Sequence, residues 1–518
     1  MIVTLAGPGA GKTTDLIQQI LKVIPNVSVN REIAVITYTN SSANDLREKL
    51  MRKMSIPKNL FVGTMHSFLF KYYIQPFAHE IGFKTSNTII VDKFNDVGVD
   101  WVEDWAQRKI DPAQRNQRIK AIKLGKRNRQ LEAAAKKGIY TFDGIIKISK
   151  TLSEDKNISR AISNRLQYLF VDEYQDIDKY GHNIIMQLYK QKKTIISIVG
   201  DPDQSIYRFR YGNSQIGEQA PKKGKQPLNE LMDLSENSLD VELRELTINH
   251  RSSKEIVEFN NRYGTLSNQE AENASICPVQ FLDSVDIDIM KKRLFEEGEK
   301  YGCESYLILA KENSTLQDFE DVLEESSDIK IGIYEINHII DIFIADTGLS
   351  KKRFQEKYNL SKFQIRRIAI ATRTALMNKQ ISPDNISHYC KGKIKELFSI
   401  DVNLGNDQTT DNDGKKLSYG YKSDIEQAEK VYVKNVKCMT IHKSKGLEAD
   451  VVLVLANTES EMLKWLNMTK TNMKSDTDET YRLGYVAFTR PRKVLILACR
   501  EKVDIRKIKP NVKICVIT

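Results

Sequence analysis

The sequence predicts an α/β protein with two parallel-sheet domains, each interrupted by a mostly helical insertion. Three observations support this fold class. Strand and helix signals alternate over residues 1–70, the order that builds a parallel sheet with crossover helices. A second set of apolar strand segments begins near Leu246 and continues to 493–499. Each set is broken by a polar, helical and basic stretch, at 72–138 and at 331–430.

The strand segments follow one another in a regular order. In the first set, MIVTLAG, EIAVITYT, YLFVDEYQD and TIISIVGDPDQS each place apolar residues ahead of polar ones. The second set consists of SYLILA, VKCMTIH, ADVVLVLA and KVLILAC. The expected division is a first α/β domain over 1–71 and 139–243, its insertion over 72–138, a second α/β domain over 244–330 and 431–518, and its insertion over 331–430.

Composition limits the class of protein. The chain of 518 residues has no apolar run of the roughly 18 residues that a membrane span needs. Its N-terminus lacks the features of a signal peptide, and its six cysteines are scattered without metal-ligand spacing. We therefore expect a cytoplasmic protein without a membrane partner. The formal charge of +11 favours a polyanionic partner such as nucleic acid, or else reflects a solvated lysine-rich surface.

The stretch AGPGAGKTT follows the first strand segment and predicts a phosphate-binding loop. Three glycines allow the backbone N–H groups to face a phosphate at the start of the next helix. Lys12 would bridge the β- and γ-phosphates, and the Thr13 hydroxyl would bind Mg²⁺. An ordinary glycine turn is the alternative. The residues of this loop are Ala6, Gly7, Pro8, Gly9, Ala10, Gly11, Lys12, Thr13 and Thr14.

Two later strand ends carry polar groups suited to hydrolysis. Asp172 and Glu173 end one strand segment, where the first would bind Mg²⁺ and the second would orient an attacking water. Gln204 follows the next segment and has a neutral amide that can sense a γ-phosphate. Tyr207, Phe209, Arg210 and Tyr211 then form an aromatic and basic cluster, which suits base stacking or, alternatively, core packing.

Eight segments in order resemble a superfamily 1 DNA helicase of the UvrD/Rep type. They are AGPGAGKTT, TYTNSSANDLREKL, GTMHSFL, VDEYQD, VGDPDQSIYRFR, LTINHRSS, MTIHKSKGLEADVVLV and YVAFTRPRKVLIL. The resemblance implies two RecA-like domains with ATP and Mg²⁺ between them and single-stranded DNA, or DNA with single-stranded ends, across them. It implies 3′-to-5′ movement by analogy. RNA remains an alternative substrate, because no residue pattern in the sequence indicates contact with the sugar 2′-hydroxyl.

The resemblance also implies roles for individual residues. Glu173 matches the general base, Gln204 the γ-phosphate sensor, and Glu448 the residue near the ribose. Arg251 and Arg490 match two arginines that reach the γ-phosphate from the second domain. The positions that match strand-contacting residues are Tyr38, Thr39, Asn40, Thr64, His66, Phe209, Arg210, Thr440 and His442. For His66 and His442, a structural hydrogen-bonding role is the alternative.

The sequence departs from this pattern at two adenine-reading positions. A glutamine-containing segment that usually precedes the loop has no counterpart between Met1 and Lys12, and His250 replaces a stacking aromatic. We expect relaxed nucleotide preference. The second insertion is short, and the compact layout resembles the helicase-like subunit of Gabija anti-phage defence systems, which works with a nuclease. The rival hypothesis is therefore a DNA-end sensor that regulates a partner nuclease and unwinds little. The basic stretch 108–137 is expected to contact duplex DNA or its backbone; the alternatives are a solvated helix and a docking face for a protein partner.

Overall fold

The computed structural model describes eleven stretches of the chain, which divide between two compact units. One unit is Met1–Leu323 with Asn435–Thr518, and the other is Glu324–Lys434. The described residues are 1–91, 130–207, 226–319, 336–349, 351–360, 362–377, 380–382, 385–404, 435–474, 479–510 and 512–518.

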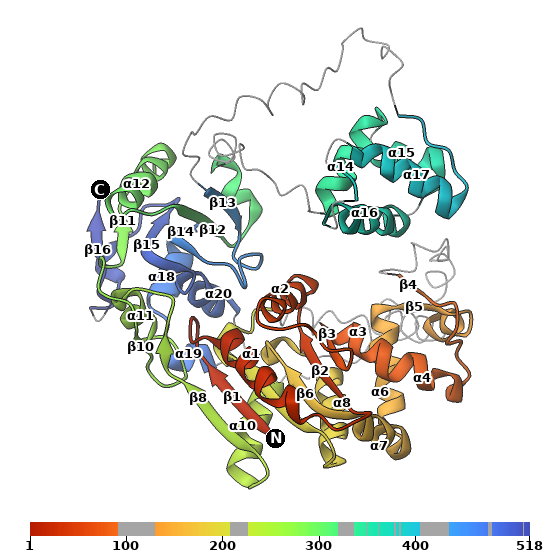
Figure 1. Ribbon diagram of the computed structural model, residues 1–518. Coiled ribbons are helices and arrows are strands. Elements are labelled where there is room, and N and C mark those ends of the chain that lie inside the picture. Colours follow the sequence, from red (N-terminus) through yellow and green to blue (C-terminus); the bar gives the residue numbers. More distant parts are fainter. Residues whose placement is uncertain are drawn as a thin grey trace, which may run out of the picture. The chain divides into compact units, whose positions relative to one another are not determined.

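The larger unit contains two six-stranded sheets in which all neighbouring strands run parallel (Figure 1). The first sheet has the order β3-β2-β6-β7-β1-β8. Its strands are β1 (Ile2–Ala6), β2 (Glu32–Thr37), β3 (Leu60–Thr64), β6 (Leu166–Val171), β7 (Ile195–Gly200) and β8 (Glu242–Leu246). The non-consecutive order means that helical crossovers connect the strands, as the alternating sequence signals predict.

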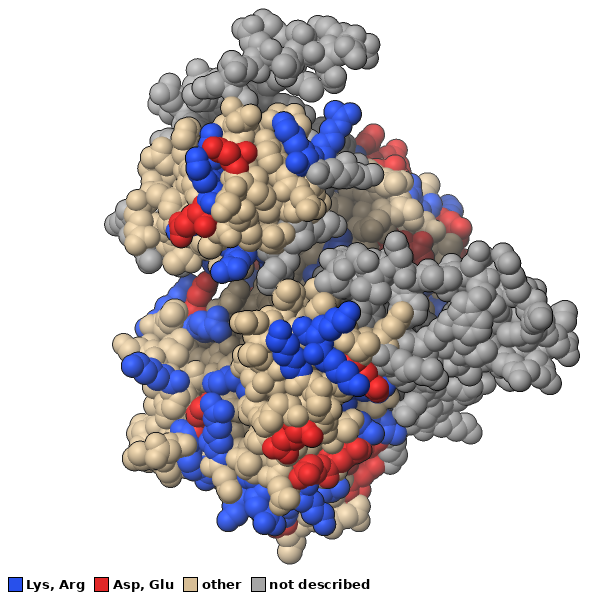
Figure 2. All heavy atoms as spheres, turned by 90° about the vertical axis from the view of Figure 1, so that its right-hand side faces the viewer, with Lys and Arg blue, Asp and Glu red and all other residues tan. Residues whose placement is uncertain are grey.

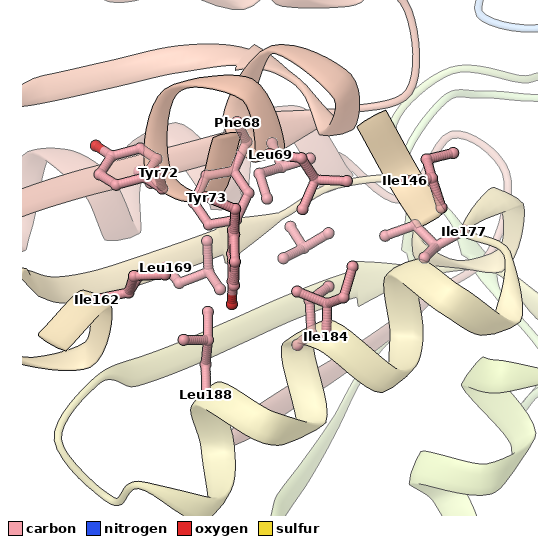
Figure 3. Packing of buried hydrophobic residues seen from close by; sticks show 14 of the residues in the cluster. Phe68, Leu69, Tyr72, Tyr73, Ile146, Ile162, Leu169, Ile177, Ile184 and Leu188 are labelled. Carbon is pink, nitrogen blue, oxygen red and sulfur yellow. The ribbon is translucent and has the colours of Figure 1, made fainter. Parts of the chain in front are cut away.

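Helices cover this sheet because their apolar residues recur on one face. On α8, Ile184 and Leu188 are four residues apart and both fully buried. Figure 3 shows both side chains pointing from the helix into the cluster, with Leu188 directed toward Leu169 of β6 and Tyr73. The helices of this part are α1 (Lys12–Val23), α2 (Asn40–Met51), α3 (Met65–Leu69), α4 (Gln75–Phe77), α6 (Phe142–Glu154), α7 (Lys156–Arg165), α8 (Lys179–Lys190) and α10 (Pro227–Asn237).

The second sheet has the order β13-β12-β14-β15-β11-β16. Its strands are β11 (Gln280–Leu282), β12 (Ser305–Ala310), β13 (Asn435–Thr440), β14 (Ala449–Ala456), β15 (Pro491–Cys499) and β16 (Cys515–Ile517). Its helices are α11 (Lys254–Asn260), α12 (Ile287–Lys300), α18 (Glu459–Leu466), α19 (Lys470–Lys474) and α20 (Glu479–Phe488). Strand β14 is almost entirely buried, which is the pattern of a strand covered on both faces.

Two small parallel pairs flank these sheets. β9 (Ile248–Asn249) pairs with β10 (Glu270–Ala271), and β4 (Ile89–Val91) pairs with β5 (Ile139–Thr141). The smaller unit is helical in its described residues. It contains α14 (Ile336–Asp346), α15 (Lys351–Tyr358), α16 (Lys362–Met377) and α17 (Ile386–Phe398), which enclose a core of their own.

The predicted fold class is confirmed by the two parallel sheets, and one expected boundary needs correction. Strand β8 pairs with β1 from Glu242 to Leu246, so the first sheet continues three residues past the expected end of the first domain at 243. The pattern ELREL alternates too weakly to reveal this edge strand from sequence. Most of the first insertion, at 92–129, lies outside the described residues.

Three further observations concern surface charge, helix hydropathy and the cysteines. Figure 2 shows Lys and Arg side chains spread over the face in view, with Asp and Glu among them, so the basic character of that face comes from many separate side chains. Among the described residues, none of the helices combines the length and apolar character required to cross a bilayer. The sulfhydryls of all six cysteines are free.

Candidate nucleotide and DNA site

The candidate site lies at the carboxyl edge of the first sheet because its strands are parallel. Strands β1, β7 and β6 are neighbours, so the loops that follow them meet at one edge. Lys12 follows β1, Gln204 follows β7, and Asp172 follows β6. Three segments that are far apart in the sequence are therefore brought together by the topology alone.

The phosphate-binding loop has the backbone conformation that its glycines permit. Gly9 and Gly11 have φ angles of 70° and 75°, in the left-handed region that glycine adopts without strain. Gly11 is also the N-cap of α1 and supplies no side-chain cap, so the first N–H groups of the helix remain available to an anion. The Lys12 ammonium donates hydrogen bonds to the carbonyl oxygens of Ala6 and Gly7 at 3.0 and 3.1 Å. The loop therefore has the form of a phosphate cradle.

The two acidic residues after β6 are differently ionised. Asp172 is 7% exposed, and burial together with the neighbouring Glu173 raises the pKa of its carboxyl to about 7. Burial also disfavours the charge on Glu173, but Lys445 and Lys12 outweigh it and hold the pKa of that carboxyl below its usual range. The ionised Glu173 suits a base. It has a left-handed φ of 51°, an unusual conformation for a non-glycine residue.

The donors near Asp172 fit a divalent cation. A buried carboxyl with a raised pKa gains most from a cation, because the added charge compensates its desolvation. Oxygen ligands are those that Mg²⁺ prefers, and Thr13 supplies a hydroxyl in the first turn of α1. Among the described residues, three or more His, Cys, Asp or Glu side chains do not gather into a self-contained metal site.

Gln204 and Arg490 join the two sheets by a direct hydrogen bond. The Gln204 amide donates to Asp201 at 2.6 Å, and its oxygen accepts a hydrogen bond from Arg490 at 2.9 Å. Arg490 immediately precedes β15 and is 2% exposed, with a further bond from Nε to the Val486 carbonyl. Burial lowers the pKa of this guanidinium to about 9, which leaves it charged at neutral pH.

Arg251 and Glu448 form a second contact on the side of the second sheet. The Arg251 Nε donates to the Glu448 carboxylate at 2.5 Å, and Arg492 donates to the other oxygen of that carboxylate at 2.7 Å. Burial disfavours the charge on Glu448, but these two arginines hold its pKa below the usual range. Arg251 also donates to the Thr489 carbonyl, which places its guanidinium beside the turn that carries Arg490.

Asn249 connects the phosphate-binding loop to the turn that carries Arg251. Its amide nitrogen donates to the Pro8 carbonyl at 2.8 Å, and its oxygen accepts from the backbone N–H groups of Arg251 and Ser252 at 3.0 Å each. A Cβ on Gly9 would lie 2.6 Å from that oxygen, so glycine is required there for the close approach. His250, next along the chain, is paired with Glu272 at 2.7 Å.

Tyr38, one of the strand-contacting candidates, stacks on Tyr207, which belongs to the aromatic and basic cluster predicted after the GDPDQS segment. Their ring centroids are 5.2 Å apart with planes inclined by 19°, and the Tyr207 hydroxyl donates to the His442 carbonyl at 3.0 Å. Tyr38 follows β2 and His442 follows β13, so this pair also lies between the two sheets. An aromatic platform of this kind can stack on bases.

Three other strand-contacting candidates have structural partners. Thr39 and Thr64 cap α2 and α3, accepting hydrogen bonds from the N–H groups of Ser42 and Ser67. His66 packs edge-on against Phe142, and burial lowers the pKa of its imidazole. Two further candidates lie at the ends of regular elements. Asn40 begins α2 and Thr440 ends β13. Phe209 and Arg210 lie outside the described residues.

Lys445 and Asn249 were not predicted as site residues. Both lie within segments that carried the resemblance, HKSKGLE and LTINHRSS, so motif membership was a signal that could have found them. Motif membership could not identify the residues that Lys445 and Asn249 contact. The Lys445 ammonium donates to the Asp176 carboxylate, across a sequence separation of 269 residues.

Known proteins resemble this chain along most of its length. A UvrD/REP helicase N-terminal domain is recognised over residues 1–138 and 99–225. The Gabija protein GajB of Bacillus cereus is 24% identical over 97% of this chain and 93% of its own length. A probable DNA helicase II homolog of Mycoplasma genitalium is 20% identical over 98% of this chain and 84% of its own. The putative ATP-dependent DNA helicase YjcD of Bacillus subtilis is 22% identical over 96% and 76%.

The geometry and these relatives agree. A phosphate-binding loop, an acidic strand end and arginines from a second parallel sheet occur in the order of the helicase motifs. The chain is therefore similar to UvrD/Rep helicases, and the N-terminal domain of that family is recognised within its first 225 residues.

Proposed function

We propose that this chain is an ATP-dependent DNA helicase or translocase that moves 3′ to 5′ on single-stranded DNA. The observation that carries the proposal is the hydrogen bond from Arg490 to Gln204. It joins a buried guanidinium of the second sheet to the residue that follows β7 in the first. A charge supplied across a domain boundary stabilises the transition state only when the domains are closed, which ties hydrolysis to domain movement.

Each site residue has a role in this proposal. The loop and Lys12 would bind the phosphates of ATP, and Thr13 and Asp172 would hold Mg²⁺. Glu173, kept ionised by nearby lysines, orients the attacking water. Gln204, Arg251 and Arg490 would surround the γ-phosphate, and Glu448, which accepts a hydrogen bond from Arg251, would contact the ribose. When bound, Mg²⁺ supplies charge neutralisation for the phosphates.

DNA would contact the same edge of the two sheets. The stacked pair of Tyr38 and Tyr207 offers an aromatic face, and sequence-independent binding needs only stacking and phosphate contacts. Because Thr39 and Thr64 already satisfy helix N-termini, we propose that they shape this surface and meet the strand through their backbone.

The test compares ATP hydrolysis with and without single-stranded DNA. We expect strong stimulation by DNA, and a loss of at least about 100-fold in kcat for Glu173→Gln, because base catalysis contributes about 10²–10⁴-fold. Glu154→Gln, on an exposed carboxylate of α6, is the matched control and should behave as the wild type. Duplexes with a 3′ or a 5′ tail then test polarity. Absence of DNA stimulation, or preference for the 5′-tailed duplex, would contradict the motor or its direction.

A second candidate function rests on the similarity to GajB along 97% of the chain. In this alternative the protein binds DNA ends and nucleotide, unwinds little, and switches a partner nuclease in anti-phage defence. The experiment measures unwinding and DNA cleavage with and without a candidate partner nuclease. Cleavage that depends on ATP turnover by this chain, with negligible unwinding, supports the sensor. Robust unwinding by the isolated chain supports the motor.

A further inference from the structure

Lys445 lies in the loop between β13 and β14 and is buried against residues of the first sheet. Its ammonium donates to the Asp176 carboxylate and, at 2.9 Å, to the Gln204 carbonyl oxygen. The Lys445 side chain is 8% exposed and that of Asp176 is fully buried. One side chain of the second sheet therefore touches two of the polar segments that follow β6 and β7.

The same ammonium also contacts the aromatic pair. It lies 5.3 Å from the centroid of the Tyr207 ring, within the range of a cation–π interaction. Tyr207 in turn stacks on Tyr38 and donates its hydroxyl to the His442 carbonyl. Lys445 is thus in contact with the catalytic edge on one side and with the expected DNA platform on the other.

A purely structural ion pair would be the simpler explanation. Burying two charges costs several kcal/mol each, and an ion pair of this kind often adds little net stability compared with apolar residues. Stability alone therefore does not explain why a lysine is placed here. The contacts with Gln204 and Tyr207 give it a further role, because Gln204 is itself bonded to Arg490.

We propose that Lys445 is a positioning residue that couples DNA at the Tyr38–Tyr207 pair to the Gln204–Arg490 contact. Rearrangement of the Tyr207 ring by a stacked base shifts the ammonium above it. That ammonium holds the Gln204 backbone and Asp176, so the shift reaches the amide that receives Arg490. This inference rests on the proposed DNA-stimulated hydrolysis and adds the residue that transmits it.

The experiment measures kcat for ATP hydrolysis with and without single-stranded oligonucleotide, KM for ATP and Kd for the oligonucleotide. Lys445→Met is compared with Lys443→Met, an exposed lysine of the same turn. We expect Lys445→Met to reduce the DNA stimulation of kcat by about tenfold or more, within the 5–150-fold range of ordinary coupling energies. KM and Kd should stay within about threefold, as expected when coupling rather than binding is lost. Lys443→Met should retain wild-type stimulation.

Two further variants keep the test decisive if Lys445→Met fails to fold. The double variant Lys445→Met/Asp176→Asn removes both buried charges, so no unpaired ion remains. Tyr207→Leu removes the ring and leaves the ion pair intact, and it should also lower the stimulation. Wild-type stimulation in the folded Lys445 variant and in Tyr207→Leu would overturn the coupling role alone. A wild-type protein without any DNA stimulation would instead overturn the proposed function.

Discussion

Replacing Asn249 by alanine tests whether the phosphate-binding loop is held by the turn that carries Arg251. The Asn249 side chain is buried and takes part in four hydrogen bonds. Alanine would leave the Pro8 carbonyl and the N–H groups of Arg251 and Ser252 without these partners. Each unsatisfied buried group costs about 1–3 kcal/mol, and the Arg251 turn is partly reached by water. We therefore expect Asn249→Ala to lower the free energy of unfolding by about 3 kcal/mol.

The assay is urea denaturation followed by ATPase kinetics on each variant. Asn249→Asp distinguishes the oxygen of the Asn249 side chain, which accepts hydrogen bonds from the Arg251 turn, from its nitrogen, which donates to the loop. It keeps the oxygen that accepts from the turn, but it places an oxygen against the Pro8 carbonyl where the nitrogen now donates at 2.8 Å. Its stability should fall at least as much as that of the alanine variant, because a buried carboxylate oxygen then faces a carbonyl oxygen. KM for ATP should rise for both variants because the loop loses its anchor.

Asn273→Ala is the matched control for these variants. This exposed asparagine donates to carbonyls of the same turn at 3.2 and 3.5 Å, from the solvent side. Its loss should change the free energy of unfolding by about 0.5 kcal/mol or less, as is usual for surface positions. If Asn249→Ala were as mild as this control and left KM for ATP unchanged, the reasoning from buried hydrogen bonds would be refuted.

Three other predictions concern catalysis, packing and nucleotide choice. Lys12→Ala should abolish ATP hydrolysis while the circular dichroism spectrum stays native, and retained turnover would contradict its phosphate role. Gly484→Ala should lower the thermal stability, because its Cβ would lie 2.5 Å from Trp465. Gly392→Ala, whose Cβ would have no atom within 4 Å, should raise the free energy of unfolding by about 0.5–1 kcal/mol. If both variants changed stability in the same direction, the close packing of Gly484 against Trp465 would be contradicted. His250→Tyr should raise the ratio of kcat/KM for ATP to that for GTP, because it restores a ring that can stack on adenine. An unchanged ratio would mean that residue 250 does not contact the nucleotide base.

Much of the fold and of the candidate site was predictable from local sequence. Parallel strands in crossover connections carry their polar loop residues at one edge, so a strand followed by GPGAGKTT and another followed by Asp172 had to face a common region. The glycines of the loop were equally informative, because few other residues adopt a left-handed backbone. The predicted roles of Lys12, Glu173 and Arg490 remain proposals that these positions support.

The tertiary structure decided which distant residues meet. Lys445 with Asp176, and Asn249 with Pro8, are separated by 269 and 241 positions. The assignment of β8 to the first sheet likewise depended on its pairing with β1. The local spacing of apolar residues predicts whether a residue faces the core or the solvent, since this depends on its neighbours in the same helix or strand. It does not predict which loop of one sheet packs against which loop of the other, because those contacts depend on the packing of whole domains.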